Sequence, residues 1–344
     1  MIKVTFFIGN GFDINVGLDT RYTDFYKYYI DKCPDDYLAN IIGDDYEFWS
    51  DLEEALGRYI ADVTPQEEEK FWRSEGNLEF ELANYLGMQM RRANPNSRKK
   101  EIALEMQRSL TEFYTELGED HGQHIADIFS RAENIVCSFI SFNYTDILDR
   151  CLEKFRELMP DNFVQYHNNR KIPLLHSTED ILHIHGTISR DMVLGVNDDT
   201  QIWNERFRKS NIYRRSLIKE EQNRSLGNSK TIKVSKTIQE STIICVFGMS
   251  IGKTDKMWWQ HICRWLQDDE ERRLVIFMPG ARKGEPDIKT HRNRKNDNVL
   301  ERLKQNADIY DEDWKQIKDQ ICVKVGPKIF RFNLAQVSDN IAGI

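Results

Sequence analysis

The chain has 344 residues, of which 40% are hydrophobic and 30% are charged, and its formal net charge is -8. This composition is typical of a folded protein of about two domains, and it excludes collagen-like and disordered proteins. The excess of acidic residues also argues against a surface that is basic overall and binds nucleic acid.

No apolar run approaches the ~18 residues of a membrane-spanning helix, and the first residues lack the apolar core and cleavage site of a signal peptide. The six cysteines contain no C-x-x-C pair, and their spacing does not suggest a disulfide framework. We therefore expect a cytoplasmic protein that does not enter a membrane and keeps its thiols reduced.

Short apolar runs rich in β-branched and aromatic residues predict the strands. Their hydrophobicity is continuous rather than alternating, which indicates strands that are covered on both faces. The predicted strands are Val4–Ile8, Ile135–Phe142, Ile181–His185, Met192–Gly195, Thr242–Phe247 and Leu274–Met278, with Ile329–Asn333 as a weaker edge candidate. The predicted fold class is α/β, with a Rossmann-like parallel sheet and helices on both of its faces.

Long stretches of helical character separate the first two predicted strands. Apolar residues recur there at helical spacing, as in Glu47–Val63, where they fall on one stripe. We predict that residues 19–132 form a large all-helical insertion, and that residues 1–18 and 133–344 together form the Rossmann-like core. The predicted helical segments are Asp19–Ile30, Glu47–Val63, Glu67–Arg73, Leu78–Met90 and Ser97–Ala132.

Two segments of the predicted core are rich in basic residues. Residues 204–236 form a polar and basic insertion, and Arg282–Lys304 follows the last predicted central strand. We interpret both segments as solvated helix faces or loops. A contact surface for nucleic acid or for an acidic partner is the alternative.

A glycine-rich turn follows the first predicted strand. The turn comprises Gly9, Asn10, Gly11, Phe12 and Asp13. At a junction of strand and helix, such a turn can present backbone N–H groups to a diphosphate. The usual dinucleotide fingerprint has a third glycine where this chain has Ile14, and no second strand with a ribose-binding acid follows. The turn is therefore either a nucleotide loop or a tight structural turn.

Two further patterns resemble ligand sites without meeting their requirements. Gly248–Thr254 is one residue too short for a Walker phosphate loop. His183 and His185 lie two residues apart, a spacing that suits a metal. His167 and His176 lie upstream, but no acidic or cysteine ligand accompanies the four at a typical spacing. We therefore expect no metal and interpret His183 as a hydrogen-bonded core histidine.

Polar turns follow four of the predicted strands. They are Gly9–Asp13, Ser141–Thr145, His183–Gly186 and Phe247–Ser250, with Asp255 beyond the last. In an open α/β sheet, ligands bind outside the carboxyl ends of the strands. We expect these turns to meet at one crevice.

The order and content of these turns resemble the sirtuin-like NAD-binding fold. That fold uses a Gly-x-Gly loop, an Asn in a strand-end turn, a His before Gly and a late Gly-x-Ser. A longer ordered set of motifs resembles the AbiH family of bacterial phage abortive-infection proteins. The motifs are Gly9–Asp13 with Gly17-Leu18, Thr20-x-Tyr22-x-Asp24-Phe25, Trp49–Glu53, Phe142–Thr145, His183-x-His185-Gly186, Gly195–Asp198 and Phe247–Trp259. Without C-x-x-C pairs, the zinc module of sirtuins is missing, which argues against protein deacylation but not against hydrolysis of NAD.

The resemblance implies a role in phage defence, with NAD as substrate or ligand and Asn143 and His185 as the catalytic residues. The Asn143 amide offers a donor and an acceptor for a ribose hydroxyl or a water, and the His185 imidazole can accept a proton near neutral pH. The alternatives are a turn asparagine that bonds its own backbone and a structural histidine.

The resemblance also suggests which residues bind the nucleotide. Besides the glycine-rich turn, they are Tyr22, Gly186, Gly248, Ser250 and Asp255. Glu53, one helical turn from Trp49, is a second candidate for catalysis or orientation. Asp255 has the alternative role of a helix cap.

The sequence therefore predicts an anti-phage protein that hydrolyses NAD to nicotinamide and ADP-ribose. Two alternatives remain open: a module that senses NAD or ADP-ribose without cleaving it, and a defence effector that targets nucleic acid. We expect a nucleotide ligand, an unidentified phage-derived trigger and a homo-oligomer as one option, and we expect no nucleic acid or membrane as partner.

Overall fold

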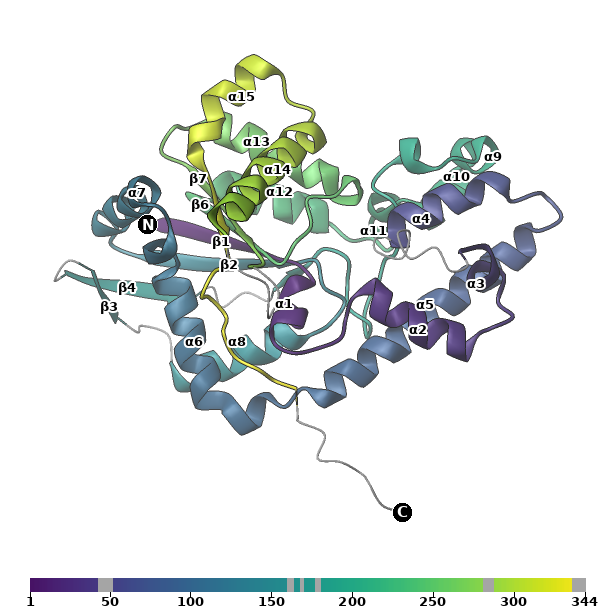
Figure 1. Ribbon diagram of the computed structural model, residues 1–344, viewed down its shortest axis with the longest axis horizontal. Helices are drawn as coiled ribbons and strands as arrows, with labels where there is room; N and C mark the ends of the chain where they lie inside the picture. The colour runs from purple at the N-terminus through teal and green to yellow at the C-terminus, as the bar shows by residue number, and fades with distance from the viewer. Residues whose placement is uncertain (43–51, 160–163, 168–169, 177–180, 281–287, 336–344) are drawn as a thin grey trace.

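The computed structural model describes residues 1–42, 52–159, 164–167, 170–176, 181–280 and 288–335. Figure 1 shows a central sheet with helices on both faces and a group of further helices to one side of it. None of the helices in these ranges is long and apolar enough to cross a membrane.

The sheet has the strand order β3-β4-β2-β1-β6-β7-β8. The six strands from β4 to β8 in this order run parallel, whereas β3 pairs antiparallel with β4 at the edge. β5 pairs parallel with the end of β2. The strands are β1 (Ile2–Ile8), β2 (Ile135–Ser141), β3 (Val164–His167), β4 (Arg170–His176), β5 (Leu182–His183), β6 (Ile243–Phe247), β7 (Arg273–Met278) and β8 (Ile321–Val325). This confirms the predicted α/β class with its parallel sheet.

Helices cover the two faces of the sheet and bury separate apolar cores. α6, α7 and α8 pack on one face, and α12 to α15 pack on the other. Burial of these faces explains why the central strands are apolar on both sides. The helices of the two layers are α6 (Lys99–Thr111), α7 (Glu119–Ser130), α8 (Ile147–Leu158), α12 (Lys230–Glu240), α13 (Lys256–Gln267), α14 (Lys289–Ala307) and α15 (Asp311–Ile317).

A third apolar core lies away from the sheet. Helices α2 to α5 build it together with α9 and α10, which begin the basic segment. These helices, with α1 and α11, are α1 (Gly11–Asn15), α2 (Tyr22–Lys32), α3 (Tyr37–Ile42), α4 (Leu52–Tyr59), α5 (Glu68–Arg92), α9 (Glu205–Lys209), α10 (Asn211–Leu217) and α11 (Lys219–Ser225). The predicted helical segments thus divide between two cores, and the predicted domain boundaries stay a prediction.

Two predicted strands are wrong. Met192–Gly195 and Ile329–Asn333 have no strand geometry, although both are largely buried. Phe330 has a φ of +54°, which a strand does not allow, and its ring packs against Phe6 and Phe12. Both segments are apolar because they fill the core as irregular chain. The edge strand near the C-terminal end of the described chain is β8 (Ile321–Val325).

Glycines let the turns after β1 and β6 pack backbone against backbone. The N–H of Gly9 donates to the carbonyl of Phe247 (3.0 Å), and the N–H of Gly11 donates to the carbonyl of Gly248 (2.7 Å). A Cβ on Gly248 would lie 2.6 Å from the backbone of Gly11 and of Phe12, and the φ of Gly248 is +68°. Contact between the two turns therefore requires glycine.

Gly248→Ala is expected to destabilise the fold through both effects. The left-handed backbone costs about 1–2 kcal/mol, and the steric overlap adds about 1–3 kcal/mol. Gly227→Ala is a matched control, because Gly227 has a φ of +71° and nothing lies within 4 Å of the place that its Cβ would take. Urea denaturation measures both variants, and equal losses of unfolding free energy would contradict the account of the contact.

Candidate functional site

The turns that follow β1, β2, β5 and β6 lie side by side at one edge of the sheet. The parallel register pairs Ile8 with Ser141 and with Phe247, and it pairs Ser141 with His183. The last residues of these strands are therefore neighbours, and the turns after them begin at the same level. This is the edge at which open α/β sheets bind ligands.

A buried carboxyl group, Asp13, lies between the first two of these turns. The hydroxyl of Thr145 donates to Oδ2 of Asp13 (2.6 Å), and Nδ2 of Asn143 donates to Oδ1 (3.2 Å). Asp13 is 1% exposed, and burial raises its pKa to about 7 although both hydrogen bonds lower it. This group therefore changes its charge near neutral pH.

Asn143 has one polar atom without a partner. Its Nδ2 donates to Asp13, whereas its Oδ1 is buried and accepts no hydrogen bond from the residues that the structure describes. An unpaired buried acceptor is costly, and the few that native proteins contain call for an explanation. A ligand hydroxyl or a water that reached this buried oxygen would satisfy it.

His185 lies in a second cluster. The rings of Phe142 and Tyr144 contact its imidazole, with centroid distances of 5.4 and 6.2 Å. Asn143 lies between these two residues in the sequence, but its side chain donates to Asp13 instead. Neighbouring side chains of this turn therefore belong to different clusters. Within the described residues, no hydrogen bond joins the predicted catalytic pair Asn143 and His185.

Lys219 holds two carboxylates beside His185. Its Nζ lies 2.8 Å from Oε2 of Glu53 and 3.1 Å from Oδ1 of Asp255. The same Asp255 oxygen lies 3.5 Å from Nε2 of His185. The four side chains are between 6% and 13% exposed, so this network is largely buried. It joins α4, α11 and the segment after β6 around the imidazole.

The charges in this network stabilise one another. Burial alone would lower the pKa of Lys219, but the charges of Asp255 and Glu53 raise it above its ordinary value. Burial alone would raise the pKa of Asp255, but Lys219 and a hydrogen bond from His185 hold it below its usual range. Asp255 is therefore a carboxylate at neutral pH and can accept a hydrogen bond from the imidazole.

Two tyrosines bind the remaining oxygen of Glu53. The hydroxyls of Tyr22 and Tyr144 donate to Oε1 of Glu53, at 3.2 and 3.0 Å. Burial and the nearby Glu53 raise the pKa of Tyr144 well above its ordinary value, so this phenol remains a donor. Tyr22 and Glu53, both candidates from the sequence, thus belong to the network of His185. Trp49, the expected neighbour of Glu53, lies outside the described residues.

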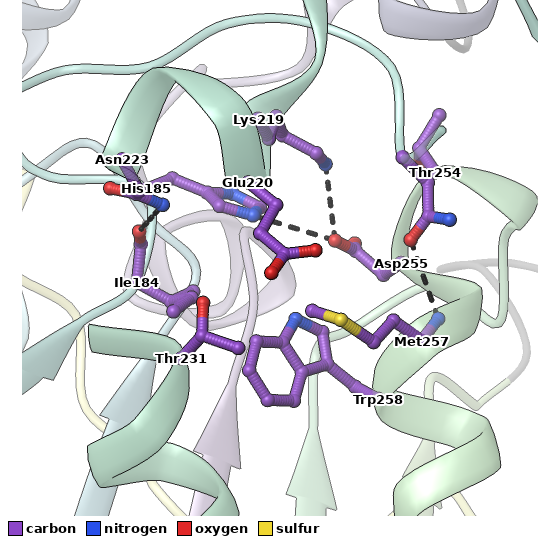
Figure 2. Close-up of a pocket in the computed structure, with 11 residues that line it drawn as sticks. Ile184, His185, Lys219, Glu220, Asn223, Thr231, Thr254, Asp255, Met257 and Trp258 are labelled. Atoms are coloured by element: carbon purple, nitrogen blue, oxygen red, sulfur yellow. Dashed lines mark hydrogen bonds and ion pairs between the residues drawn. The ribbon is translucent and has the colours of Figure 1, made fainter. Parts of the chain in front are cut away.

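A pocket opens beside His185 and Asp255 (Figure 2). Its wall is formed by the segments after β5 and β6 and by α11, α12 and α13. Lys219, Glu220 and Asn223 line it from α11, and Trp258 lines it from α13. Asn143 does not belong to this wall. The pocket is small, with a volume of about 20 Å³, and both His185 and Asp255 line it.

The glycine-rich turn after β1 is closed in by protein atoms. The N–H groups of Gly9, Gly11 and Phe12 all donate to backbone carbonyls. The ring of Phe12 is fully buried in the apolar core. Packing within the chain is therefore enough to explain why glycine occupies positions 9 and 11. The three N–H groups already have backbone partners and are not free to bind a phosphate.

The other predicted binding residues lie in varied surroundings. Nδ2 of Asn10 donates to the carbonyl of Thr20 (2.7 Å). Gly186 has a φ of +72°, and a Cβ there would overlap the carbonyl of Asp191. Ser250 is exposed. Local backbone contacts thus explain why Asn10 and Gly186 occupy their positions. Tyr22 and Asp255, in contrast, belong to the network of His185.

His183 is hydrogen bonded on both sides of its ring. Nε2 lies 3.0 Å from Oδ2 of Asp149, and Nδ1 lies 3.5 Å from the carbonyl of Asn143. This confirms the interpretation of His183 as a hydrogen-bonded histidine. Over the ranges that the structure describes, no group of three His, Cys, Asp or Glu side chains is arranged to hold a metal.

The basic segment 204–236 forms α9 to α12 and pairs many of its cations with carboxylates. The pairs are Arg206–Glu68, Lys209–Glu205, Arg214–Glu221, Lys219–Glu53, Arg224–Glu220 and Lys236–Glu240. Paired cations release fewer counterions on a polyanion than free cations do. This pairing weakens the case for a nucleic-acid surface on this segment.

Sequence reasoning did not select Lys219, Glu220 or Asn223 as site residues. Lys219 was one of several lysines and arginines in a polar segment, and composition alone does not separate a buried lysine from exposed ones. The apolar pair Leu217 and Ile218, directly before it, was the available signal that this part of the segment turns inward.

The Rossmann-like sheet and the polar pocket beside the carboxyl ends of its strands define a mixed α/β protein whose pocket lies at the edge where such sheets bind ligands. Compared with known families, the chain matches "Bacteriophage abortive infection AbiH" over residues 5–277. Since this match covers more than half of the chain, the protein belongs to the AbiH family, which confirms the resemblance of the motifs. Membership implies a role in abortive infection, a defence against bacteriophage. No curated protein matches the chain.

The raised pKa of Asp13 predicts a stability difference that depends on pH. The folded protein keeps the Asp13 proton up to about pH 7, whereas the unfolded chain releases it near 3.8. Compared with Asp13→Asn, the wild type therefore loses stability as the pH rises between these values, by at most about 1.4 kcal/mol per pH unit. Chemical denaturation between about pH 5 and about pH 8 measures this, and a difference that does not change with pH would contradict it.

Lys219→Met is expected to cost about 3–5 kcal/mol, because it leaves Glu53 and Asp255 buried without a counter-charge. Lys253→Met is the control: the Lys253 side chain is 65% exposed and lies 3.9 Å from Glu54, so its loss should change stability by less than about 0.5 kcal/mol. Thermal and chemical denaturation compare the two variants. Similar small losses in both would show that the buried network does not hold the site together.

Proposed function

We propose that the protein is an NAD glycohydrolase of an abortive-infection defence, which cleaves NAD to nicotinamide and ADP-ribose. The observation that carries this proposal is the His185–Asp255 pair in the wall of a pocket beside the carboxyl ends of parallel strands. The ordered likeness of the strand-end turns to the sirtuin-like fold supports NAD as the substrate.

In this reaction the main task of the protein is to position the reacting groups. Nicotinamide is a good leaving group, and cleavage passes through an oxocarbenium-like transition state at the ribose. The protein must hold the ribose, exclude competing groups and orient one water molecule. The water oxygen bonds to the ribose carbon as the bond to nicotinamide breaks, and the proton of the water passes to a base.

His185 is the residue that suits the base. Oδ1 of Asp255 lies 3.5 Å from its Nε2, and this carboxylate can orient the ring. With Asp255 at Nε2, the base would be Nδ1, which has no hydrogen-bond partner among the residues that the structure describes. A positioned general base of this kind accelerates a reaction by about 10²–10⁴-fold.

Asn143 is the residue that suits the ribose or the attacking water. Its unpaired Oδ1 can accept a hydrogen bond from either, while Asp13 holds its Nδ2. Because Asn143 belongs to the other cluster, the substrate must reach across the turn after β2 to meet both side chains.

The burial of the site favours a second candidate, a module that binds the nucleotide without cleaving it. His185 and Asn143 are each 5% exposed, so little of either residue meets solvent in this conformation. A resting state with a closed site suits a sensor as well as a latent enzyme. Saturable NAD binding without product formation in any state distinguishes the sensor.

The test is NAD turnover by purified protein, with nicotinamide and ADP-ribose measured by chromatography. We expect His185→Ala to lower kcat by about 10²–10⁴-fold with an unchanged fold, and Asn143→Ala to lower it as well. His124→Ala, in α7 and remote from the pocket, is the control and should keep wild-type turnover. Turnover that survives both site substitutions would contradict the assignment, and a thermal shift with NAD but no product would favour the sensor.

A further inference from the structure

We infer that the pocket beside His185 binds an organic cation and disfavours phosphate. In the reaction proposed above, on which the identity of the ligand rests, that cation is the pyridinium ring of oxidised nicotinamide. The class of ligand follows from the charges, the aromatic wall and the unpaired acceptor of the pocket itself.

The charge of the pocket wall is negative. Lys219 is the ammonium group that lines it, and Glu53 and Asp255 already balance that charge at 2.8 and 3.1 Å. Glu220 adds a further carboxylate, and Figure 2 shows its side chain among the other lining side chains, next to Asp255 in this view. A phosphate in this place would be repelled, whereas a cation would be attracted.

Glu220 has a cationic partner that does not belong to the pocket wall. Arg224, one turn further along α11, pairs with Glu220 at 2.7 Å, and its side chain is 71% exposed. With Arg224 counted, the cluster has three carboxylates, Glu53, Asp255 and Glu220, against the two cations Lys219 and Arg224. One negative charge therefore remains in excess beside the pocket.

Two further features of the wall suit a pyridinium that carries a carboxamide. Trp258 lines the pocket, and indole is the aromatic ring that attracts cations most strongly. Asn223 is 3% exposed and lines the pocket, its Nδ2 donates to the carbonyl of Ile184 (3.1 Å), and its Oδ1 has no partner among the described residues. An amide N–H of the ligand would satisfy this acceptor.

The negative charge of the pocket determines which redox form of the nucleotide it binds. Oxidised nicotinamide carries a positive charge, and reduced nicotinamide has the same carboxamide without the charge. A negative pocket distinguishes the two forms by charge alone. The pocket thus selects the oxidised dinucleotide, which is also the form whose nicotinamide is a good leaving group.

The test uses two small probes that contain no bond to ribose and cannot be cleaved. 1-Methylnicotinamide is a cation, and nicotinamide is its neutral counterpart with the same ring and carboxamide. Titrations of the full chain followed by ligand-observed NMR give the two dissociation constants. We expect the cation to bind about five- to tenfold more tightly, with a preference that shrinks as salt is added.

The preference is expected to depend on Glu220. Glu220→Gln should reduce it to about twofold or less, because the carboxylate is replaced by a neutral side chain of the same shape. Glu221→Gln is the matched control: Glu221 is the next residue of α11, pairs with Arg214 at 2.7 Å and does not line the pocket. This control should keep the wild-type preference.

Equal affinity for the two probes, or a preference that Glu220→Gln leaves intact, would overturn the inference. So would inorganic phosphate that displaces the cation from the wild type at constant ionic strength. Because the probes are not substrates, a cation preference in a protein that never cleaves NAD would refute the proposed function and leave this inference standing. NAD cleavage without a cation preference would refute this inference and leave the proposed function standing. If Glu220→Gln unfolds, the salt dependence of the two probes on the wild type decides the question.

Discussion

The arrangement of this site depends on one buried ammonium group. Lys219 lies between Glu53 and Asp255, which come from α4 and from the segment after β6, and it lies itself at the start of α11. This charge offsets the repulsion between two desolvated carboxylates from segments far apart in the sequence. The orientation of His185 follows from it, since Asp255 faces the imidazole with the same oxygen that Lys219 binds.

The parallel register of the sheet also determines how the site is arranged. It aligns the ends of β1, β2, β5 and β6, so that the polar turns after them begin together. The turn after β2 then sends alternate side chains to two clusters, with Asn143 toward Asp13 and Tyr144 toward Glu53. A ligand that engages both clusters must therefore lie across this turn. Membership of the AbiH family gives the protein a role in phage defence.

The centre of the fold was predictable, because β1, β2, β6 and β7 are continuous apolar runs of the kind that strands covered on both faces have. β8 was missed because Lys324 interrupts its apolar pattern at the sheet edge. Ile329–Asn333 was mistaken for a strand because irregular chain that fills a core is equally apolar. The sequence pointed to His185 through its motif, but not to Lys219, since the burial of that lysine depends on Glu53, 166 positions away.

We propose that this edge of the sheet performs chemistry on NAD. Proton NMR of NAD mixed with the purified protein tests this most directly, because substrate, nicotinamide and ADP-ribose have separate resonances in one spectrum. We expect the nicotinamide and ADP-ribose signals to grow in equal amounts as NAD disappears, and the spectrum to stay unchanged with the His185→Ala protein. An NAD spectrum that only broadens, or that does not respond to the wild-type protein at all, including protein taken from phage-infected cells, would contradict it.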